Sequence, residues 1–213
     1  MDFFNRIRKP NSLSVPKAIV NSLMIFMSGI ILGIISKALD EIPVNLLPTF
    51  FEMIDLRNFF SRIGFWMFIG ICIAVYAKTP LRAALNNILF FIGMVGSYYI
   101  YTITIAGFFP KSYMMLWVGM TIISPVLGML CWYAKGTHIV SVCISAIIFM
   151  MMTRQAFNFG FWYFDISYVL ETLLWVATIV ILYRKPKQIA CVIMAGIVLF
   201  FITSQLRIFG GWM

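Results

Sequence analysis

The sequence has little charge, and acidic residues are the scarcest charged type. Lys and Arg number 16 and Asp and Glu only 7 in 213 residues, so 11% of the chain is charged. A soluble domain has about a quarter of its residues charged, because its surface must face water. The shortage of charge, together with 62% hydrophobic residues, excludes a water-soluble globular protein. Lipid must therefore surround most of this chain.

Histidine and the common catalytic motifs are also rare or missing. His138 is the single histidine, which disfavours histidine-based metal sites and Ser-His or Cys-His catalysis. The sequence contains no H-E-x-x-H, P-loop or G-x-S-x-G motif and no paired aspartates for magnesium. The four cysteines lie in hydrophobic runs without a C-x-x-C pair, which is typical of packing residues. We expect neither a metal nor a cofactor, and an intramembrane enzyme is the least favoured function class.

Seven hydrophobic runs reach or approach the length of about 20 residues that a helix needs to cross a bilayer. They cover residues 18–37, 62–78, 82–106, 112–134, 138–156, 167–183 and 187–207, of which the second and sixth are the shortest. The first run is longer than a signal-peptide core and no cleavage-site pattern follows it, so we expect a retained helix. The sequence predicts an all-α fold: a single transmembrane helical bundle over residues 1–213, with about seven spans.

Membrane topology explains the net charge of +9. A cytoplasmic N-terminus puts 10 of the 16 basic residues on the cytoplasmic side, in agreement with the positive-inside rule. They are Arg6, Arg8, Lys9, Lys17, Lys78, Arg82, Lys135, Arg184, Lys185 and Lys187. Seven spans then place the C-terminus on the extracytoplasmic side. The basic residues form no stripe interleaved with aromatics, so we expect no nucleic-acid partner.

The connection at residues 38–61 is long enough to have structure of its own. Beyond Pro43 and Pro48, its polar residues recur at every third position among phenylalanines; they are Thr49, Glu52, Asp55, Asn58 and Ser61. This spacing predicts a short amphipathic helix at about 45–61, lying in the outer membrane interface. The segment would either cover the outer end of the bundle or act as a lid over a pocket.

Two further patterns indicate contacts between helices. Gly29-x-x-x-Gly33 in the first run presents a small-residue face, which would pack another helix of the bundle or dock a separate membrane subunit. Arg82 and Asn86 lie one helical turn apart at the start of the third run. Capping and hydrogen bonding between helices explain this pair.

Polar and aromatic residues inside the runs collect on the extracytoplasmic side of the predicted topology. Glu171 is the only acid within a run, and a carboxylate at membrane depth is a functional hypothesis by default. Either Glu171 and Arg154 form a structural ion pair, or they form the polar floor of a solute pocket. The candidate ligand-binding residues are Glu171, Trp175, Tyr168, Arg154, Asp165, Tyr98, Tyr101, Trp117 and Thr121. Tyr99 lies off the face of Tyr98 and is expected in the aromatic interface belt.

Several segments in the middle of the chain carry a resemblance. They are residues 78–86 (KTPLRAALN), 90–94 (FFIGM), 98–101 (YYIY), 107–114 (GFFPKSYM), 124–125 (SP) and 131–136 (CWYAKG). The chain resembles an uncharacterised family of small multi-pass membrane proteins from Gram-positive bacteria, which implies a bacterial plasma membrane and no assigned activity. Its architecture is also similar to that of the substrate-binding subunits of energy-coupling-factor vitamin transporters, most of which have six helices.

The leading hypothesis is a membrane protein that binds a small polar or aromatic solute from the extracytoplasmic side. It would act as a transporter or as the substrate-binding subunit of one, and the one-sided polar cluster around Glu171 motivates it. The alternative is a non-catalytic accessory subunit of a larger membrane complex, with the Gly29/Gly33 face as one contact.

Overall fold

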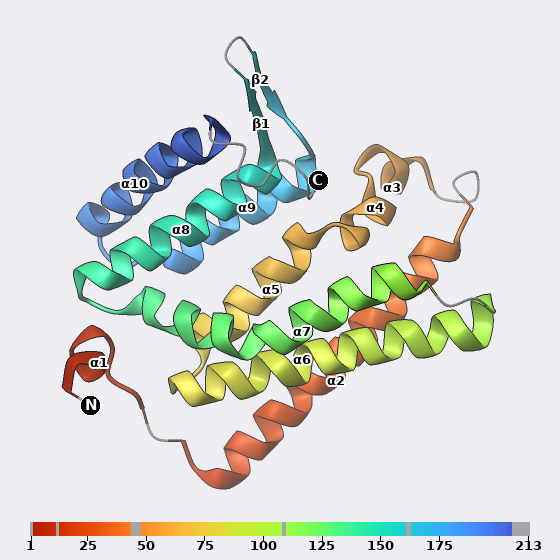
Figure 1. Ribbon diagram of the computed structural model, residues 1–213, viewed down its shortest axis with the longest axis horizontal. Coiled ribbons are helices and arrows are strands. Elements are labelled where there is room, and N and C mark those ends of the chain that lie inside the picture. Colours follow the sequence, from red (N-terminus) through yellow and green to blue (C-terminus); the bar gives the residue numbers. More distant parts are fainter. Residues whose placement is uncertain (1, 12, 44–47, 108–109, 161–162, 206–213) are drawn as a thin grey trace. The chain divides into compact units, whose positions relative to one another are not determined.

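The computed structural model describes the whole chain except residues 1, 12, 44–47, 108–109, 161–162 and 206–213. Each of the seven hydrophobic runs contains one helix (Figure 1). The elements are α1 (Asp2–Ile7), α2 (Val15–Glu41), α3 (Thr49–Met53), α4 (Leu56–Ser61), α5 (Ile63–Tyr76), α6 (Pro80–Tyr101), the π-helical turn η2 (Thr102–Ala106), α7 (Lys111–Trp132), the 3-10 turn η3 (Tyr133–Lys135), α8 (Ile139–Ala156), β1 (Phe157–Gly160), β2 (Tyr163–Ile166), α9 (Val169–Leu182) and α10 (Pro186–Gln205).

Within the described residues, five helices are long and apolar enough to cross a membrane. They are α2, α6 with the start of η2, α7 with η3, α8 and α10. The helices in the second and sixth runs, α5 and α9, are apolar but have 14 residues each. At 1.5 Å per residue they are about 21 Å long, less than the hydrocarbon core of about 30 Å. The helical fold with several helices able to cross a membrane is confirmed, and the count of seven spans stays a prediction.

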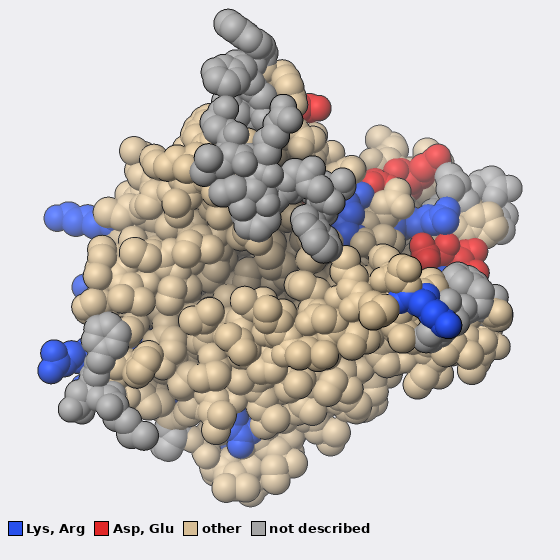
Figure 2. Space-filling view, in the orientation of Figure 1, with Lys and Arg blue, Asp and Glu red and all other residues tan. Residues whose placement is uncertain are grey.

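The side chains of α2 are distributed as lipid requires. Its buried positions are mostly small or polar: Ala18, Ser22, Gly29, Gly33, Ser36 and Lys37. Its large apolar side chains are exposed instead, among them Ile19, Leu23, Met27 and Ile31. In water this arrangement would cost about 25 cal/mol for each Å² of exposed apolar surface. Most of the visible surface in Figure 2 is likewise uncharged.

The described chain forms two compact units. Unit 1 contains residues 1–9, 63–68 and 133–213, and unit 2 contains residues 10–62 and 69–132. Helix α5 therefore contributes its first residues to unit 1 and its remainder to unit 2. The single transmembrane domain that the sequence predicts over 1–213 stays a prediction.

Unit 2 is built on a parallel pair of helices, α2 and α6, with α7 against α6. The backbones of α2 and α6 approach closely, because a Cβ atom on Gly29 would collide with the Phe90 carbonyl oxygen and one on Gly33 with that of Met94. Ser97 Oγ also donates a hydrogen bond to the Ile30 carbonyl at 3.0 Å. The Gly29/Gly33 face thus packs inside the bundle, so it is not available to a separate subunit.

The segment between α2 and α5 differs from the single amphipathic helix predicted over about 45–61. Residues 48–61 form two short helices, α3 and α4, while residues 44–47 lie outside the described part. The helix breaks at Asp55, whose φ of 54° is left-handed, a conformation that aspartate adopts more readily than most residues. The Asp55 carboxylate accepts hydrogen bonds from Asn58 Nδ2 at 2.7 Å and Arg62 Nη1 at 2.6 Å, which stabilise the break.

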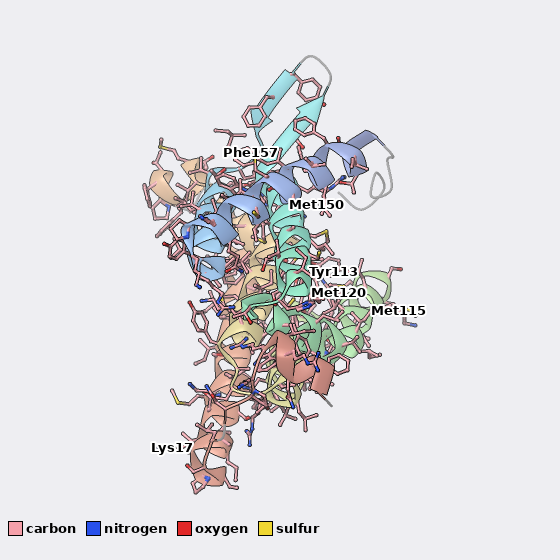
Figure 3. The ribbon with its side chains drawn as sticks, turned by 90° about the vertical axis from the view of Figure 1, so that its left-hand side faces the viewer. Lys17, Tyr113, Met115, Met120, Met150 and Phe157 are labelled. Atoms are coloured by element: carbon pink, nitrogen blue, oxygen red, sulfur yellow. The ribbon has the colours of Figure 1, made fainter. Side chains whose placement is uncertain are left out.

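Unit 1 contains α8, α9, α10 and an antiparallel β-hairpin, which the sequence analysis did not anticipate. Strands β1 and β2 pair Phe157 with Ile166 and Asn158 with Asp165, and Phe157 lies where the hairpin leaves α8 (Figure 3). Aromatic side chains favour strands, so the aromatic run beginning at Phe157 was the missed signal. The hairpin makes α8 and α9 antiparallel neighbours.

The close approach of α2 and α6 gives a first prediction. Gly33→Ala should lower the free energy of unfolding by about 1–3 kcal/mol, because the new methyl group must push α2 away from the Met94 carbonyl. The matched control is Gly96→Ala on α6, where a Cβ meets no described atom within 4 Å. Thermal unfolding in detergent measures both. Equal unfolding temperatures for the two variants would contradict the packing described here.

Candidate functional site

The residues predicted around Glu171 fall in unit 1, at the hairpin end of α8 and α9. Glu171 is 0% exposed. One turn further on, Trp175 Nε1 donates a hydrogen bond to Thr153 Oγ1 of α8 at 2.9 Å. The Trp175 ring lies 5.4 Å from the ring of Phe149 and 5.2 Å from that of Phe157. Aromatic packing therefore fills this face of α9.

The other unit 1 candidates lie around this group. Arg154 lies in the last turn of α8, directly after Thr153, the residue to which Trp175 donates its hydrogen bond. Tyr168 is the N-cap residue of α9 and is exposed. Asp165 is exposed on β2, opposite Asn158. The structure thus brings Glu171 and Trp175 to the Arg154 end of α8 and leaves Tyr168 and Asp165 at the surface.

The candidates in unit 2 include Tyr98, which joins a charged cluster at the C-terminal end of α2. Lys37 is 2% exposed, and its Nζ lies 3.3 Å from Asp40 Oδ2 and 2.5 Å from Glu41 Oε1. Tyr98 donates its hydroxyl to Asp40 Oδ2 at 3.3 Å, and Lys37 Nζ is 5.6 Å from the centre of the Tyr98 ring. Lys37 is not among the site residues predicted from the sequence, although its i+3 and i+4 spacing to the two acids indicates ion pairs. The carboxylates of Asp40 and Glu41 therefore neutralise the charge of Lys37 within this cluster.

Trp117 and Thr121 are both buried on α7. Thr121 donates its hydroxyl to the Trp117 carbonyl at 2.8 Å, and Ser124 donates to the Thr121 carbonyl at 2.8 Å. Pro125 has no N–H for that carbonyl, so the Ser124 hydroxyl replaces the lost backbone donor. These polar groups satisfy one another within α7.

Of the remaining tyrosines of this region, Tyr99 departs from its predicted place. Tyr101 is half-buried at the end of α6. Tyr99 was expected at the membrane interface, but it is 6% exposed. That interpretation was wrong, because helix packing in unit 2 covers the face on which Tyr99 lies.

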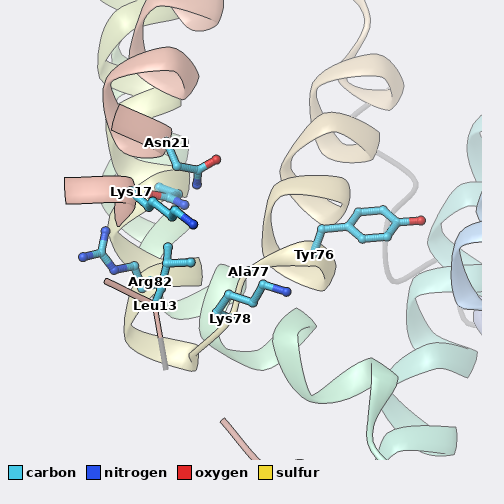
Figure 4. Close-up of a pocket in the computed structure, with 8 residues that line it drawn as sticks. Leu13, Lys17, Asn21, Tyr76, Ala77, Lys78 and Arg82 are labelled. Atoms are coloured by element: carbon cyan, nitrogen blue, oxygen red, sulfur yellow. The ribbon is translucent and has the colours of Figure 1, made fainter. Parts of the chain in front are cut away.

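A hollow of about 230 Å³ lies at the opposite end of α2 and α6 in unit 2. It is lined by Leu13, Lys17, Asn21, Tyr76, Ala77, Lys78, Arg82 and Asn86, and we call it the cationic cavity. Figure 4 shows Lys17 and Asn21 of α2 and Lys78 of the α5–α6 connection extending toward a common space. The lining holds three cations and two amides but no carboxylate.

A hydrogen-bond network positions Arg82 at the wall of the cationic cavity. Arg82 Nη1 donates to the Ala18 carbonyl at 2.9 Å and to Ser22 Oγ at 3.4 Å. Ser22 in turn donates to Asn86 Oδ1 at 2.7 Å. Thr79 caps α6 by accepting from the Arg82 backbone N–H at 3.1 Å. The capping and helix–helix bonding predicted for this pair are confirmed.

Arg82 also borders a second hollow, which is apolar. This groove of about 330 Å³ is lined by Ile19, Ser22, Leu23, Phe26, Arg82, Leu85 and Leu89. The guanidinium therefore lies between a polar space and an apolar one. Arg82 is not among the site residues predicted from the sequence, because capping and hydrogen bonding between helices already explain it there.

The network gives a second prediction. Ser22→Ala should cost about 1–3 kcal/mol of unfolding free energy, because Asn86 Oδ1 loses its donor in a site that is 1% exposed. Ser28→Ala is the matched control, since the exposed Ser28 hydroxyl bonds only the Ile25 carbonyl of its own helix. Thermal unfolding in detergent compares them. A loss for Ser28→Ala as large as that for Ser22→Ala would contradict the network.

Comparison with known proteins adds no relative to this picture. No family model, no curated protein and no solved structure matches the chain. Among the described residues, no group of three or more His, Cys, Asp or Glu side chains is placed to hold a metal ion.

Proposed function

We propose that this chain is a multi-pass membrane protein of a bacterial plasma membrane that binds a small anionic solute. It would act as a transporter or as the substrate-binding subunit of one. The observation that carries the proposal is the cationic cavity, where Lys17, Lys78 and Arg82 border one space without a carboxylate. Three like charges at one wall repel one another unless an anion joins them.

The chemistry of the cavity favours a small anion with several acceptor oxygens. Guanidinium and ammonium groups are donors only, and the Asn21 amide adds a donor beside them. Hydrogen bonds between such cations and an oxyanion are roughly twice as strong as neutral ones. A volume of about 230 Å³ admits a small solute and not a folded partner.

This proposal moves the binding site away from the end expected from the sequence. Asn21 and Lys37 are 16 residues apart on α2, which is about 24 Å along the helix. In the predicted topology the cationic cavity would face the cytoplasm. The Lys37 cluster at the other end contains its own acids, whereas the cavity lining contains none.

An extracytoplasmic site at Glu171 is the second candidate. Its support is the complete burial of a carboxylate beside Trp175, because ionisable groups at membrane depth usually mark solute pathways. The structural ion-pair alternative predicts no ligand there. An accessory subunit is the remaining alternative, and it would need a docking surface other than Gly29 and Gly33.

Loss of cavity cations gives the third prediction. A thermal-shift screen with phosphate, sulfate and small carboxylates should find a stabilising anion, and calorimetry should give its affinity. Lys17→Gln and Lys78→Gln should each weaken binding about tenfold, roughly 1.4 kcal/mol, by removing one charge from the lining. The matched control is Lys111→Gln, an exposed lysine of α7 outside the lining, which should bind as the wild type does.

The two candidate sites give opposite results in the same assay. Glu171→Gln and Trp175→Ala should leave the affinity unchanged if the anion occupies the cationic cavity. Weaker binding in these two variants, with normal binding in Lys17→Gln and Lys78→Gln, would place the solute at Glu171 instead.

Orientation gives the fourth prediction. In a cysteine-free background, Lys111→Cys should react with a membrane-impermeant maleimide in intact cells, and Lys78→Cys only after permeabilisation. Both lysines are exposed and lie beyond opposite ends of α6. Identical labelling of the two positions would mean that α6 does not cross the membrane.

A further inference from the structure

A second basic cluster lies in unit 1, where α8 and α10 begin. It joins residues from three separate segments: Arg8 after α1, Lys135 in η3 and Arg184 between α9 and α10. Arg184 Nη1 donates a hydrogen bond to the Gly136 carbonyl, and Thr137 N donates to the Ile7 carbonyl at 2.9 Å. Arg8 and Lys135 are chain neighbours of Ile7 and Gly136, so these two bonds gather all three cations.

Close packing fixes the turn that carries this cluster. A Cβ atom on Gly136 would collide with the Ile7 carbonyl oxygen and with Ser141 Oγ of α8. The rings of Phe4 and Tyr133 lie 5.8 Å apart and fasten α1 to η3. Burial, and to a lesser extent the charge of Arg184, lowers the pKa of the Arg8 guanidinium. Arg8 and Arg184 also lie close enough to Lys135 for their charges to repel it.

Two buried donors accompany the cations. Ser141 is 0% exposed, and neither its Oγ nor the buried Nε2 of Gln188 has a hydrogen-bond partner among the described residues. Gly196 of α10 packs against Phe149 and the Ala146 carbonyl of α8. The helices run parallel in Figure 1; Gln188 lies eight residues before Gly196, and Ser141 lies five residues before Ala146 and eight before Phe149. The two donors are therefore at the same level of unit 1.

The three cations at this level attract negative charge, although η3 and α9 also end here with their carbonyl groups. Helices α8 and α10 both begin at this end, which adds the positive ends of two helix dipoles. Among the described side chains of unit 1 the carboxylates are Asp165 and Glu171, and both lie toward the hairpin end. An unpaired buried donor costs about 1–3 kcal/mol, so a ligand that accepts from Ser141 and Gln188 would recover that cost.

We propose that the cluster of Arg8, Lys135 and Arg184, with Ser141 and Gln188, binds the phosphate group of an anionic phospholipid. A phosphate diester offers several acceptor oxygens and no donor, which matches the three cations and the unpaired Ser141 hydroxyl and Gln188 side-chain N–H group. The apolar exterior of the same helices, with Ile139 and Met194 exposed, provides the surface along which acyl chains lie. Basic pockets between transmembrane helices bind lipid headgroups in this way. The site lies in unit 1 and is independent of the cationic cavity.

Native mass spectrometry of the purified full chain in detergent tests the proposal. Phosphatidylglycerol and phosphatidylcholine are titrated separately, and the retained lipid is measured against concentration. We expect at least tenfold tighter retention of phosphatidylglycerol by the wild-type chain. Arg184→Gln should abolish most of this preference, and Ser141→Ala should reduce it about fivefold to tenfold, because each removes a donor from the site.

Matched controls separate a binding role from a structural one. Ser145→Ala removes a buried hydroxyl one turn further along α8, where it donates to the Ala134 carbonyl at 3.0 Å, so it should lower stability without changing lipid retention. Ser141→Ala in lipid-free detergent should unfold at the same or a higher temperature than the wild type, because it removes an unpaired donor. Lys111→Gln controls for the loss of one charge.

The lipid retention of the wild type and of two variants decides the proposal. Equal retention of the two lipids by the wild-type chain, or unchanged retention in both Ser141→Ala and Arg184→Gln, overturns the proposal. A third outcome is that inorganic phosphate stabilises the wild type but not Ser141→Ala, while neither lipid is preferred. The site would then bind phosphate, and the proposal that a phospholipid supplies it would be overturned. The affinities of Lys17→Gln and Lys78→Gln for a soluble anion do not bear on this result.

Discussion

The arrangement of this fold depends on the scarcity of water around its helices. In lipid, burying a leucine between helices gains little, because the acyl chains are as apolar as the leucine. Helices must associate through close backbone contact and hydrogen bonds instead. The pair α2 and α6 shows both, with Gly29 and Gly33 beneath carbonyl groups of α6 and Ser22 bonded to Asn86. On α2, small and polar residues therefore occupy most buried positions, and large apolar ones are exposed.

The same constraint explains what the buried hydroxyl groups do. Thr102, Thr121, Thr153 and Thr178 each donate to the carbonyl four residues earlier in their own helix. A threonine inside a span thus satisfies its donor locally and needs no ligand. The polar residues around Trp117 and Thr121 are therefore weak evidence for a solute pocket, because they bond one another within α7.

Helix positions were readily predicted from the sequence, whereas the cationic cavity was not. Hydrophobic runs of about 20 residues fix where helices form, since the backbone must satisfy itself in lipid. The cavity depends on which helix starts meet, and that follows from the parallel packing of α2 and α6. Lys17, Lys78 and Arg82 each obeyed the positive-inside rule, so nothing in their spacing distinguished a shared wall from three topology signals. The helix predicted from the three-residue spacing of polar residues at 49–61 is likewise interrupted at Asp55, which has a left-handed backbone conformation.

The length of α9 has a consequence for the bilayer around the protein. Fourteen residues span about 21 Å, yet Leu173, Val176 and Val180 on this helix are exposed. Where α9 crosses a membrane of ordinary thickness, as the seven-span prediction requires, its apolar surface would be roughly 9 Å too short for the lipids against it. Such a hydrophobic mismatch costs fractions of a kcal/mol per ångström and is relieved by local thinning of the membrane. The chain would accordingly deform the lipid beside α9 and partition toward thinner regions of the membrane.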